Sequence, residues 1–237
     1  MKRLIAALSI AAVCCSIASA QMPTIQEKTT GMKKYSGYFD FYWEEETGQI
    51  WLEIDETDQE FLYVNSLAAG LGSNDVGLDR NQLGNTRLVK FHRVGPKVLI
   101  IQPNTSFRAI SDNPDERKAV EDAFATSVVW GFTVGAEEEG RGLIDLTQFF
   151  LRDAHNAAGR LKRSNQGNFA LDKSRSAIYL PNTKNFSKNT EFEALLTFTA
   201  KNPGEYVREV APDPNSITIR NHHSFIELPD DGYEPRV

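Results

Sequence analysis

Cysteine is nearly absent from this sequence. The chain of 237 residues contains only Cys14 and Cys15, and both lie in its first 20 residues. Those residues read as a cleaved leader, so the mature chain would contain no cysteine. This excludes a cysteine nucleophile and stabilisation by disulfides. An exported chain of this kind must then be held together by a hydrophobic core or by a bound metal.

An excess of basic residues is also missing. The chain has 26 Lys and Arg residues against 32 Asp and Glu residues, which gives a net charge of −6. Loss of Lys2 and Arg3 with the leader takes the net charge to −8. Nucleic-acid-binding domains present a basic face, and attraction to anionic lipid needs clustered cations. We therefore expect no nucleic-acid partner and no electrostatic attraction to membranes.

The common catalytic motifs are absent as well. The four histidines are His92, His155, His222 and His223. None of them belongs to a His-Glu-x-x-His motif, so a zinc-protease site of that type is excluded within this chain. No Gly-x-Ser-x-Gly elbow is present. The glycine-rich run after Gly70 breaks the dinucleotide-binding fingerprint, because Asp75 replaces its last glycine. We assign no catalytic, cofactor-binding or metal-binding residue, and whether the chain is an enzyme stays open.

The first 20 residues are typical of a secretory signal peptide. Lys2 and Arg3 supply the positive start, residues 4–17 are apolar, and residues 18–20 form a small-residue cleavage site. The apolar stretch is shorter than the roughly 20 residues that span a bilayer. A lipid anchor at Cys14 is disfavoured, because Val13 precedes it where a small residue is needed. The pattern predicts export to the periplasm or the extracellular space, without stable membrane insertion after cleavage.

Alternating apolar residues predict an α+β fold that is predominantly β. Phe39, Phe41 and Trp43 share one face of a strand, and the apolar residues at 50, 52 and 54 line a second strand. The continuous apolar run at 98–101 is typical of a strand buried on both faces. Further strands are expected at residues 61–64, 88–91, 127–134, 143–146, 177–180, 192–199 and 217–228. These strands fit an antiparallel sandwich or a curved sheet.

One or two short helices interrupt the strands. Asn113 can cap a helix that starts at Pro114, and the acidic residues 115 and 116 complement its dipole. Residues 120, 123 and 124 give that helix one apolar stripe. A weaker helix is predicted over residues 154–162. Residues 21–34 are polar and are expected to be mobile, so residues 21–57 divide into a leader and a first hairpin, and residues 58–237 form the β-rich domain.

Most of the mature chain resembles one protein family. The resemblance centres on residues 61–93, FLYVNSLAAGLGSNDVGLDRNQLGNTRLVKFHR, where two alternating runs flank a glycine-rich connection. It also includes YFDFYW at 38–43, VGPKVL at 94–99, VEDAF at 120–124, FLRDAH at 150–155, SRSA at 174–177, APDP at 211–214 and HHSFIELP at 222–229. These segments resemble the uncharacterised β-rich N-terminal region of large, secreted bacterial zinc-dependent metalloproteases of the met-zincin type.

The resemblance implies a role and a partner. In that family the catalytic domain follows the β-rich region, so this chain resembles a fragment that ends before its protease domain. The implied function is a non-catalytic scaffold or regulatory region. Zinc would belong to the absent catalytic domain, which would be the intramolecular partner. The alternative is a stand-alone extracytoplasmic β-domain that binds a protein or a glycan through loops such as residues 70–84.

Three local clusters contain side chains that are able to bind ions or transfer protons. His222 and His223 are neighbours on a predicted strand, so they point to opposite faces and do not easily coordinate one ion together. We expect His223 to be packed and His222 to lie at the surface. Arg152, Asp153 and His155 surround a helix start, where Asp153 can cap and His155 can titrate near neutrality. In the loop 70–84, Asn74, Asp75 and Asp79 offer oxygen ligands without EF-hand spacing, and the simpler interpretation is a long turn.

Overall fold

A computed structural model gives the fold, and it describes residues 22–55, 57–230 and 232. The predicted signal peptide lies outside these residues. The strands are β1 (Lys33–Tyr35), β2 (Phe41–Glu44), β3 (Gln49–Ile54), β4 (Glu60–Ala69), β5 (Gln82–Val94), β6 (Lys97–Gln102), β7 (Ser127–Glu138), β8 (Arg141–Asp145), β9 (Ala170–Ile178), β10 (Lys184–Asn185), β11 (Asn189–Thr199) and β12 (Ser216–Glu227). The α-helices are α1 (Ile25–Lys28), α2 (Pro114–Ala123), α3 (Thr147–Phe150), α4 (Ala157–Arg163) and α5 (Glu205–Val210), and a 3-10 turn spans Leu180–Asn182.

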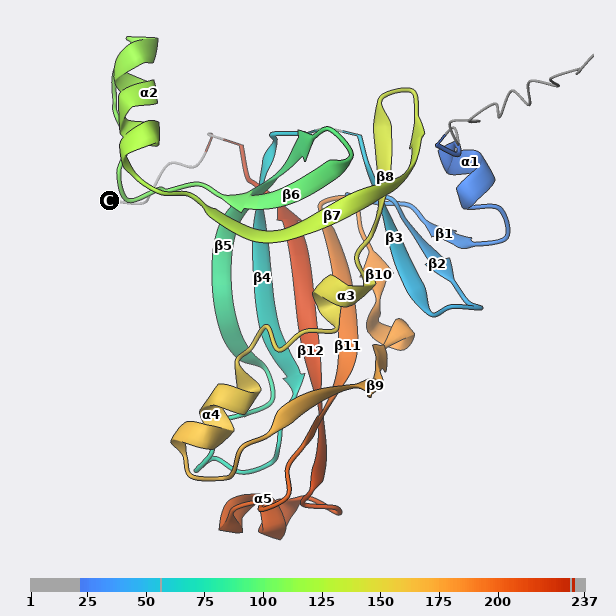
Figure 1. Cartoon of the computed structure of the whole chain (residues 1–237), viewed down its shortest axis with the longest axis vertical. Helices are drawn as coiled ribbons and strands as arrows, with labels where there is room; N and C mark the ends of the chain where they lie inside the picture. The colour runs from blue at the N-terminus through green and yellow to red at the C-terminus, as the bar shows by residue number, and fades with distance from the viewer. Residues whose placement is uncertain (1–21, 56, 231, 233–237) are drawn as a thin grey trace, which may run out of the picture.

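The strands form one curved antiparallel sheet (Figure 1). Its order is β1-β2-β3-β8-β7-β6-β5-β4-β12-β11-β10, with β9 pairing to the same strand, β11, as β10. The prediction of a predominantly β fold with antiparallel strands is confirmed, and the curved sheet is the form that it takes. The first hairpin belongs to this sheet, because β3 pairs with β8.

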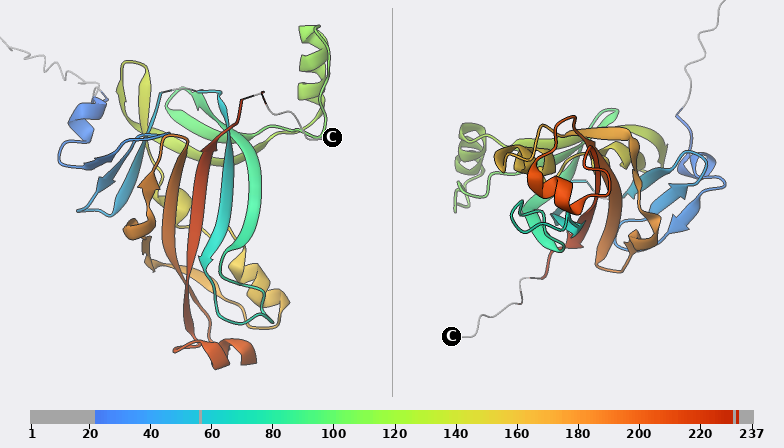
Figure 2. Two further views of the ribbon diagram at one scale, coloured as in Figure 1. Left: turned by 180° about the vertical axis from the view of Figure 1, so that it is seen from behind. Right: turned by 90° about the horizontal axis from the view of Figure 1, so that it is seen from below.

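The sheet curls into a half-barrel, and hydrogen bonds join its first and last strands (Figure 2). The backbone N–H of Tyr38 donates to the carbonyl of Phe186 at 2.7 Å. The side-chain amide of Asn185 donates to the carbonyls of Tyr35 and Phe39, at 2.8 and 2.7 Å. These bonds satisfy backbone groups that an open edge would leave unpaired, and they fix the curl around the core.

Aromatic rings fill the concave side of the half-barrel. On β12 the inward positions alternate as the sequence predicts, with Ile217, Ile219 and Phe225 all at most 3% exposed. Helix α3 lies over the same face and buries Phe149 and Phe150 completely. The core therefore forms between the sheet and the chain segment that connects β8 to β9.

The prediction that residues 21–34 are mobile is wrong for the described residues 22–34. Thr24 and Glu27 form a reciprocal capping box at the start of α1, with bonds of 3.1 and 2.9 Å. Ile25 is 2% exposed and packs in a small apolar cluster with Tyr42 and Leu143. The Thr-x-x-Glu spacing was the sequence signal for this helix. Its burial against the sheet, which a local pattern does not show, keeps the segment ordered.

Two further expectations need correction. The run in β6 is not buried on both faces: Val98 and Ile100 face the core, whereas Leu99 and Ile101 are only half-buried on the other side. The helix after Asn113 is confirmed as α2, but none of its residues is buried. It stands away from the sheet in every view (Figures 1 and 2). The described part has five short α-helices, more than the one or two predicted.

None of the described helices combines the length and apolarity needed to cross a bilayer.

Candidate functional site

The two neighbouring histidines of β12 lie on opposite faces of the sheet. His222 faces outward, where its Nε2 lies 2.6 Å from Glu191 and its Nδ1 lies 3.5 Å from Glu193. Despite its partial burial, these two carboxylates raise the pKa of His222 to about 9. His222 thus lies on the outer face, as expected, where it is a half-buried, charged residue in an ion-pair cluster on β11 and β12.

His223 faces inward and belongs to a row of buried polar groups. The guanidinium of Arg152 donates to the Tyr63 hydroxyl at 3.0 Å, and that hydroxyl lies 2.8 Å from Nδ1 of His223. Burial and the nearby Arg152 charge hold the pKa of His223 well below its usual range, and burial raises that of Tyr63 to about 12. The expectation that His223 is packed and hydrogen-bonded is confirmed. His223 and Tyr63 are both neutral.

Asn221 completes this row. Its Nδ2 lies 3.2 Å from Nε2 of His223, and its Oδ1 is the buried side-chain atom that has no hydrogen-bond partner among the described residues. Arg152 can only donate, so the Tyr63 hydroxyl accepts from it. The directions of the other two bonds in the row follow from which ring nitrogen of His223 carries the proton.

The segment that starts at Arg152 closes the other side of the same polar region. Asp153 accepts hydrogen bonds from the backbone of Ala157 and Ala158, at 2.7 and 2.9 Å, which confirms it as a capping residue for α4. Nδ1 of His155 lies 3.5 Å from the amide of Asn65 on β4. Burial and the charge of Arg160 lower the pKa of His155 from its ordinary value, against the opposing effect of Asp153.

This polar region is sealed inside the fold. Tyr63, Asn65, Asn221 and His223 are each at most 2% exposed. A substrate has no access to groups that are buried so completely, and we conclude that the region fixes the position of the segment after α3 over the sheet. In the sequence, Asn65 and Asn221 stand at inward positions of alternating strands. A polar residue in the apolar phase of a strand was the signal that sequence reasoning missed.

The glycine-rich connection between β4 and β5 is a fixed loop (residues 70–81) at the other end of these strands. Leu78 is fully buried, and the backbone of Leu71 donates to its carbonyl at 2.9 Å. Gly72 and Gly77 have φ angles of 92° and 69°, so the predicted turn with positive φ is confirmed at these two positions. At Gly70 a Cβ would lie 2.0 Å from the Leu78 carbonyl oxygen, so glycine is required there by lack of space and not by its φ angle.

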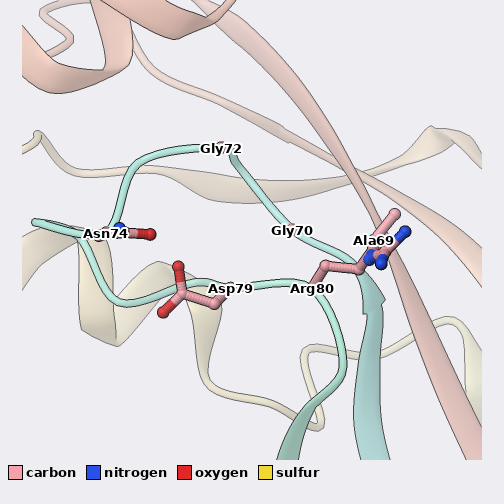
Figure 3. Close-up of a pocket in the computed structure, with 6 residues that line it drawn as sticks. All are labelled: Ala69, Gly70, Gly72, Asn74, Asp79 and Arg80. Atoms are coloured by element: carbon pink, nitrogen blue, oxygen red, sulfur yellow. The ribbon is translucent and has the colours of Figure 1, made fainter.

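This loop encloses an open pocket of about 460 Å³. Its lining is Ala69, Gly70, Gly72, Asn74, Asp79 and Arg80 (Figure 3). The side chains of Asn74 and Asp79 point into the loop toward one another, and that of Arg80 extends along Ala69. Asp75 is not part of the lining, so only two of the three predicted oxygen ligands come together. The described residues contain no group of three or more His, Cys, Asp or Glu side chains arranged to hold a metal.

A second surface lies beside the excursion between β6 and β7, which we call the arm (residues 103–126). Phe107 and Phe124 stack in parallel at its base, with ring centroids 3.9 Å apart, although the two side chains are 51% and 36% exposed. Ile110 is fully exposed. The groove between the arm and the outer face of the sheet has a volume of about 450 Å³. It is lined by Glu60, Leu88, Lys90, Ile101, Pro103, Asn104, Thr105, Phe107, Arg108, Ala109, Arg117, Val120, Glu121, Phe124 and Thr126.

Two family models match the chain. Residues 81–237 match the model described as Domain of unknown function (DUF5117), which covers β5 to β12. The chain belongs to the DUF5117 family. Residues 22–70 match a second model, Domain of unknown function (DUF5118). In this DUF5117 member β4, from the second match, pairs with both β5 and β12, so the two matched segments build one sheet. No curated protein and no solved structure matches the chain.

Proposed function

We propose that this chain is the non-catalytic N-terminal region of an exported zinc-dependent metalloprotease of the met-zincin type. Its role is to position or restrain a protease domain that follows Val237. Zinc in that domain would activate a water molecule for attack on a peptide carbonyl. The proposal assigns no zinc ligand to the present chain, in which His222 and His223 face opposite sides of the sheet and His155 contacts Asn65 and Gln82.

The observation that carries this proposal is the arm. Helix α2 has 10 residues and buries none of them, whereas isolated helices shorter than about 12–15 residues are marginal in water. It is held by the Asn113 cap, by the stacked pair of Phe107 and Phe124, and by a 2.5 Å bond between Ser111 and Glu116. A projecting helix with exposed aromatic and aliphatic side chains supports a surface that another domain covers.

Amide hydrogen exchange tests this proposal directly. The reading frame beyond Val237 should encode a segment with His-Glu-x-x-His, and the longer protein and residues 21–237 would be compared. We expect amides 114–123 to exchange at least about tenfold more slowly in the longer protein, because a covered helix opens less often. A stop codon after Val237, or equal exchange in both proteins, would contradict the scaffold role.

Activity gives a second, independent test. Residues 21–237 alone should not hydrolyse casein, since the proposal assigns peptide hydrolysis to the following domain. Turnover of casein by this purified chain, abolished by a chelator, would place a zinc site here and overturn the assignment. The Phe107→Ser variant of the longer protein should keep its zinc but lose part of the protection at residues 114–123.

The alternative function is a stand-alone extracytoplasmic β-domain that binds a protein or a glycan. The loop 70–81 favours it, because Asn74 and Asp79 face each other in an open pocket on a rigid frame. The two functions predict different solution behaviour. An uncovered docking surface should cause self-association of residues 21–237, which Phe107→Ser and Ile110→Ser relieve. A stand-alone binder should be monomeric without these changes.

A further inference from the structure

Strand β5 is longer than the strand beside it, so part of its edge has no partner strand among the described residues. Strand β6 pairs with residues 90–94 of β5, whereas β4 pairs with β5 from Gln82 onward. Residues 82–89 therefore have a strand on one side only, and there β5 forms the outer margin of the sheet (Figures 1 and 2). Leu83 is 73% exposed, and residues 84–86 are exposed as well.

The backbone groups of this edge point away from the sheet. The carbonyl of Phe91 accepts from the backbone of Asp58 at 2.7 Å, on the side of β4. Backbone groups alternate sides along an antiparallel strand, so those of Lys90 face β6, and those of Leu88 and Thr86 face the same way past the end of β6. No backbone hydrogen bond among the described residues reaches Thr86 or Leu88 on that side. Such a row of unpaired N–H and C=O groups is a template for an added strand.

The other end of the sheet is protected against this kind of pairing. Strand β1 carries Lys33 and Lys34, and hydrogen bonds of Asn185 join the first and last strands. Lysine on an edge strand discourages pairing with another chain. Residues 83–86 of β5 read Leu-Gly-Asn-Thr, and they interrupt the ladder with a bulge opposite Asn65 but carry neither charge nor proline. The β5 edge is therefore open to a partner in a way that the β1 edge is not.

The concave face beside the β5 edge is positively charged. Arg87 is the register partner of Tyr63, so both side chains lie on this face, and Arg152 donates to the Tyr63 hydroxyl at 3.0 Å. Both arginines are half-buried, and neither has an ion pair with a carboxylate among the described residues. Burial raises the pKa of Tyr63 to about 12 against the charges of Arg152 and Arg87, and no carboxylate contributes to that rise.

The carboxylates of the neighbouring segments do not balance these two charges. Asp153 accepts hydrogen bonds from the backbone at the start of α4. Asp79 faces Asn74 in the loop pocket, and Glu60 lies on the outer face, where it lines the groove with Lys90. A second copy of the chain, paired edge to edge, would bring its own arginines to the same place. The charges therefore favour a partner with acidic side chains over a second copy.

We infer that the free edge of β5 binds an extended acidic peptide segment of a partner protein, which adds to the sheet in line with β6. The segment pairs with the backbone of Thr86 and Leu88, and one of its acidic side chains lies opposite Arg87. Facing residues of adjacent strands have Cβ atoms about 4.5–5.5 Å apart, so a Glu or Asp side chain reaches that guanidinium. The inference goes beyond the proposed function, since it concerns a partner of the sheet and not the domain that covers the arm.

A designed peptide tests this site on residues 21–237. The probe is fluorescently labelled Thr-Val-Glu-Val-Glu-Val-Thr, in which the glutamates share one face of the strand and the valines share the other. Its control has lysine in place of both glutamates. In fluorescence anisotropy titrations we expect the acidic probe to bind at least about tenfold more tightly than the basic one, because opposite charges on facing residues stabilise strand pairing and like charges destabilise it.

Two variants of Thr86 test the backbone pairing. Thr86→Pro removes the N–H that faces the free side, where proline is tolerated in an edge strand. Thr86→Val is the matched control, because it keeps that N–H and favours a strand. We expect Thr86→Pro to weaken binding of the acidic probe at least about tenfold, and Thr86→Val to change it by less than about twofold. Urea titrations of both variants check that the sheet itself is intact.

Arg87→Glu tests the charge independently of the backbone. This variant should reverse the preference, so that the basic probe binds more tightly than the acidic one. A purely structural role of Arg87 would not produce such a reversal. Equal binding of the two probes by the unmodified chain, or no binding of the acidic probe up to about 1 mM, would overturn the inference. Dimers in sedimentation that Thr86→Pro dissociates and Phe107→Ser does not would overturn it too, and would assign the edge to a second copy.

Discussion

His222 and His223 are neighbours on strand β12, but they lie on opposite faces of the sheet and their pKa values are shifted in opposite directions. On the outer face Glu191 and Glu193 hold His222 charged. On the inner face the imidazole of His223 is fully buried between Tyr63 and Asn221 and stays neutral. The difference comes from the neighbours that strands β4 and β11 place on each face. The outer face tolerates charge, whereas the inner face must satisfy each polar group or lose stability.

Truncation of a ring on the inner face should have the largest effect. Seven other rings lie within 6.3 Å of Phe225, measured between centroids: Phe39, Phe61, Tyr63, Phe91, Phe149, Phe150 and Phe192. Phe225→Ala should lower the free energy of unfolding by about 3–5 kcal/mol in urea titrations. The outward neighbour gives the control: Ile226→Ala should cost about 1 kcal/mol or less. Equal losses at both positions would remove the distinction between the faces.

Removal of one hydroxyl tests the polar row itself. Tyr63→Phe leaves the side chain volume almost unchanged, but it deprives both Arg152 and His223 of their partner. We expect a loss of about 1–3 kcal/mol in the free energy of unfolding, because the fully buried His223 then loses its Nδ1 partner and Arg152 keeps only its bond to the Phe149 carbonyl. A double-mutant cycle with Arg152→Met should show coupling, since each change removes the same bond. Additive losses would mean that the row does not act as one unit.

The pH dependence of stability should separate the two histidines. The pKa of His222 is about 9 in the folded protein and 6.5 as its ordinary value. The folded state therefore binds the extra proton, and its contribution is complete below pH 6.5 and lost as the pH rises through 9. Between these limits His222→Gln should flatten a fall in stability of up to about 1.4 kcal/mol per pH unit. A slope that this variant leaves unchanged would contradict the ion-pair cluster.

Below pH 6.5 the dependence of stability on pH should have the opposite sign. The pKa of His223 is lowered by burial, so below pH 6.5 the unfolded chain binds a proton that the folded chain excludes. Stability should fall as the pH drops, and His155 acts in the same direction. His223→Leu should reduce this loss of stability at acid pH, whereas His222→Gln should leave the part of it that comes from His223 and His155 unchanged.

The sequence predicts well what depends on neighbouring residues, and poorly what depends on the curl of the sheet. Alternation in β12 placed Phe225 and His223 on one face, and the cap at Asn113 placed α2. Nothing local shows that Tyr63 and Arg152, 89 positions apart, share a hydrogen bond. The apolar stripe of α2 suggested burial, yet none of its residues is buried and the helix projects from the body.

The smallest effect should come from the cap of that helix. The side chain of Asn113 accepts from the backbone of Asp115 at 3.0 Å, and Asn113→Ala should cost α2 about 1 kcal/mol. Exchange of amides 114–123 should then be about fivefold faster, while global stability stays unchanged, because α2 buries nothing. Asp153→Ala removes the equivalent bonds from α4, whose Leu161 is fully buried, and should lower global stability instead. A matching global loss in Asn113→Ala would show that the arm folds as part of the body.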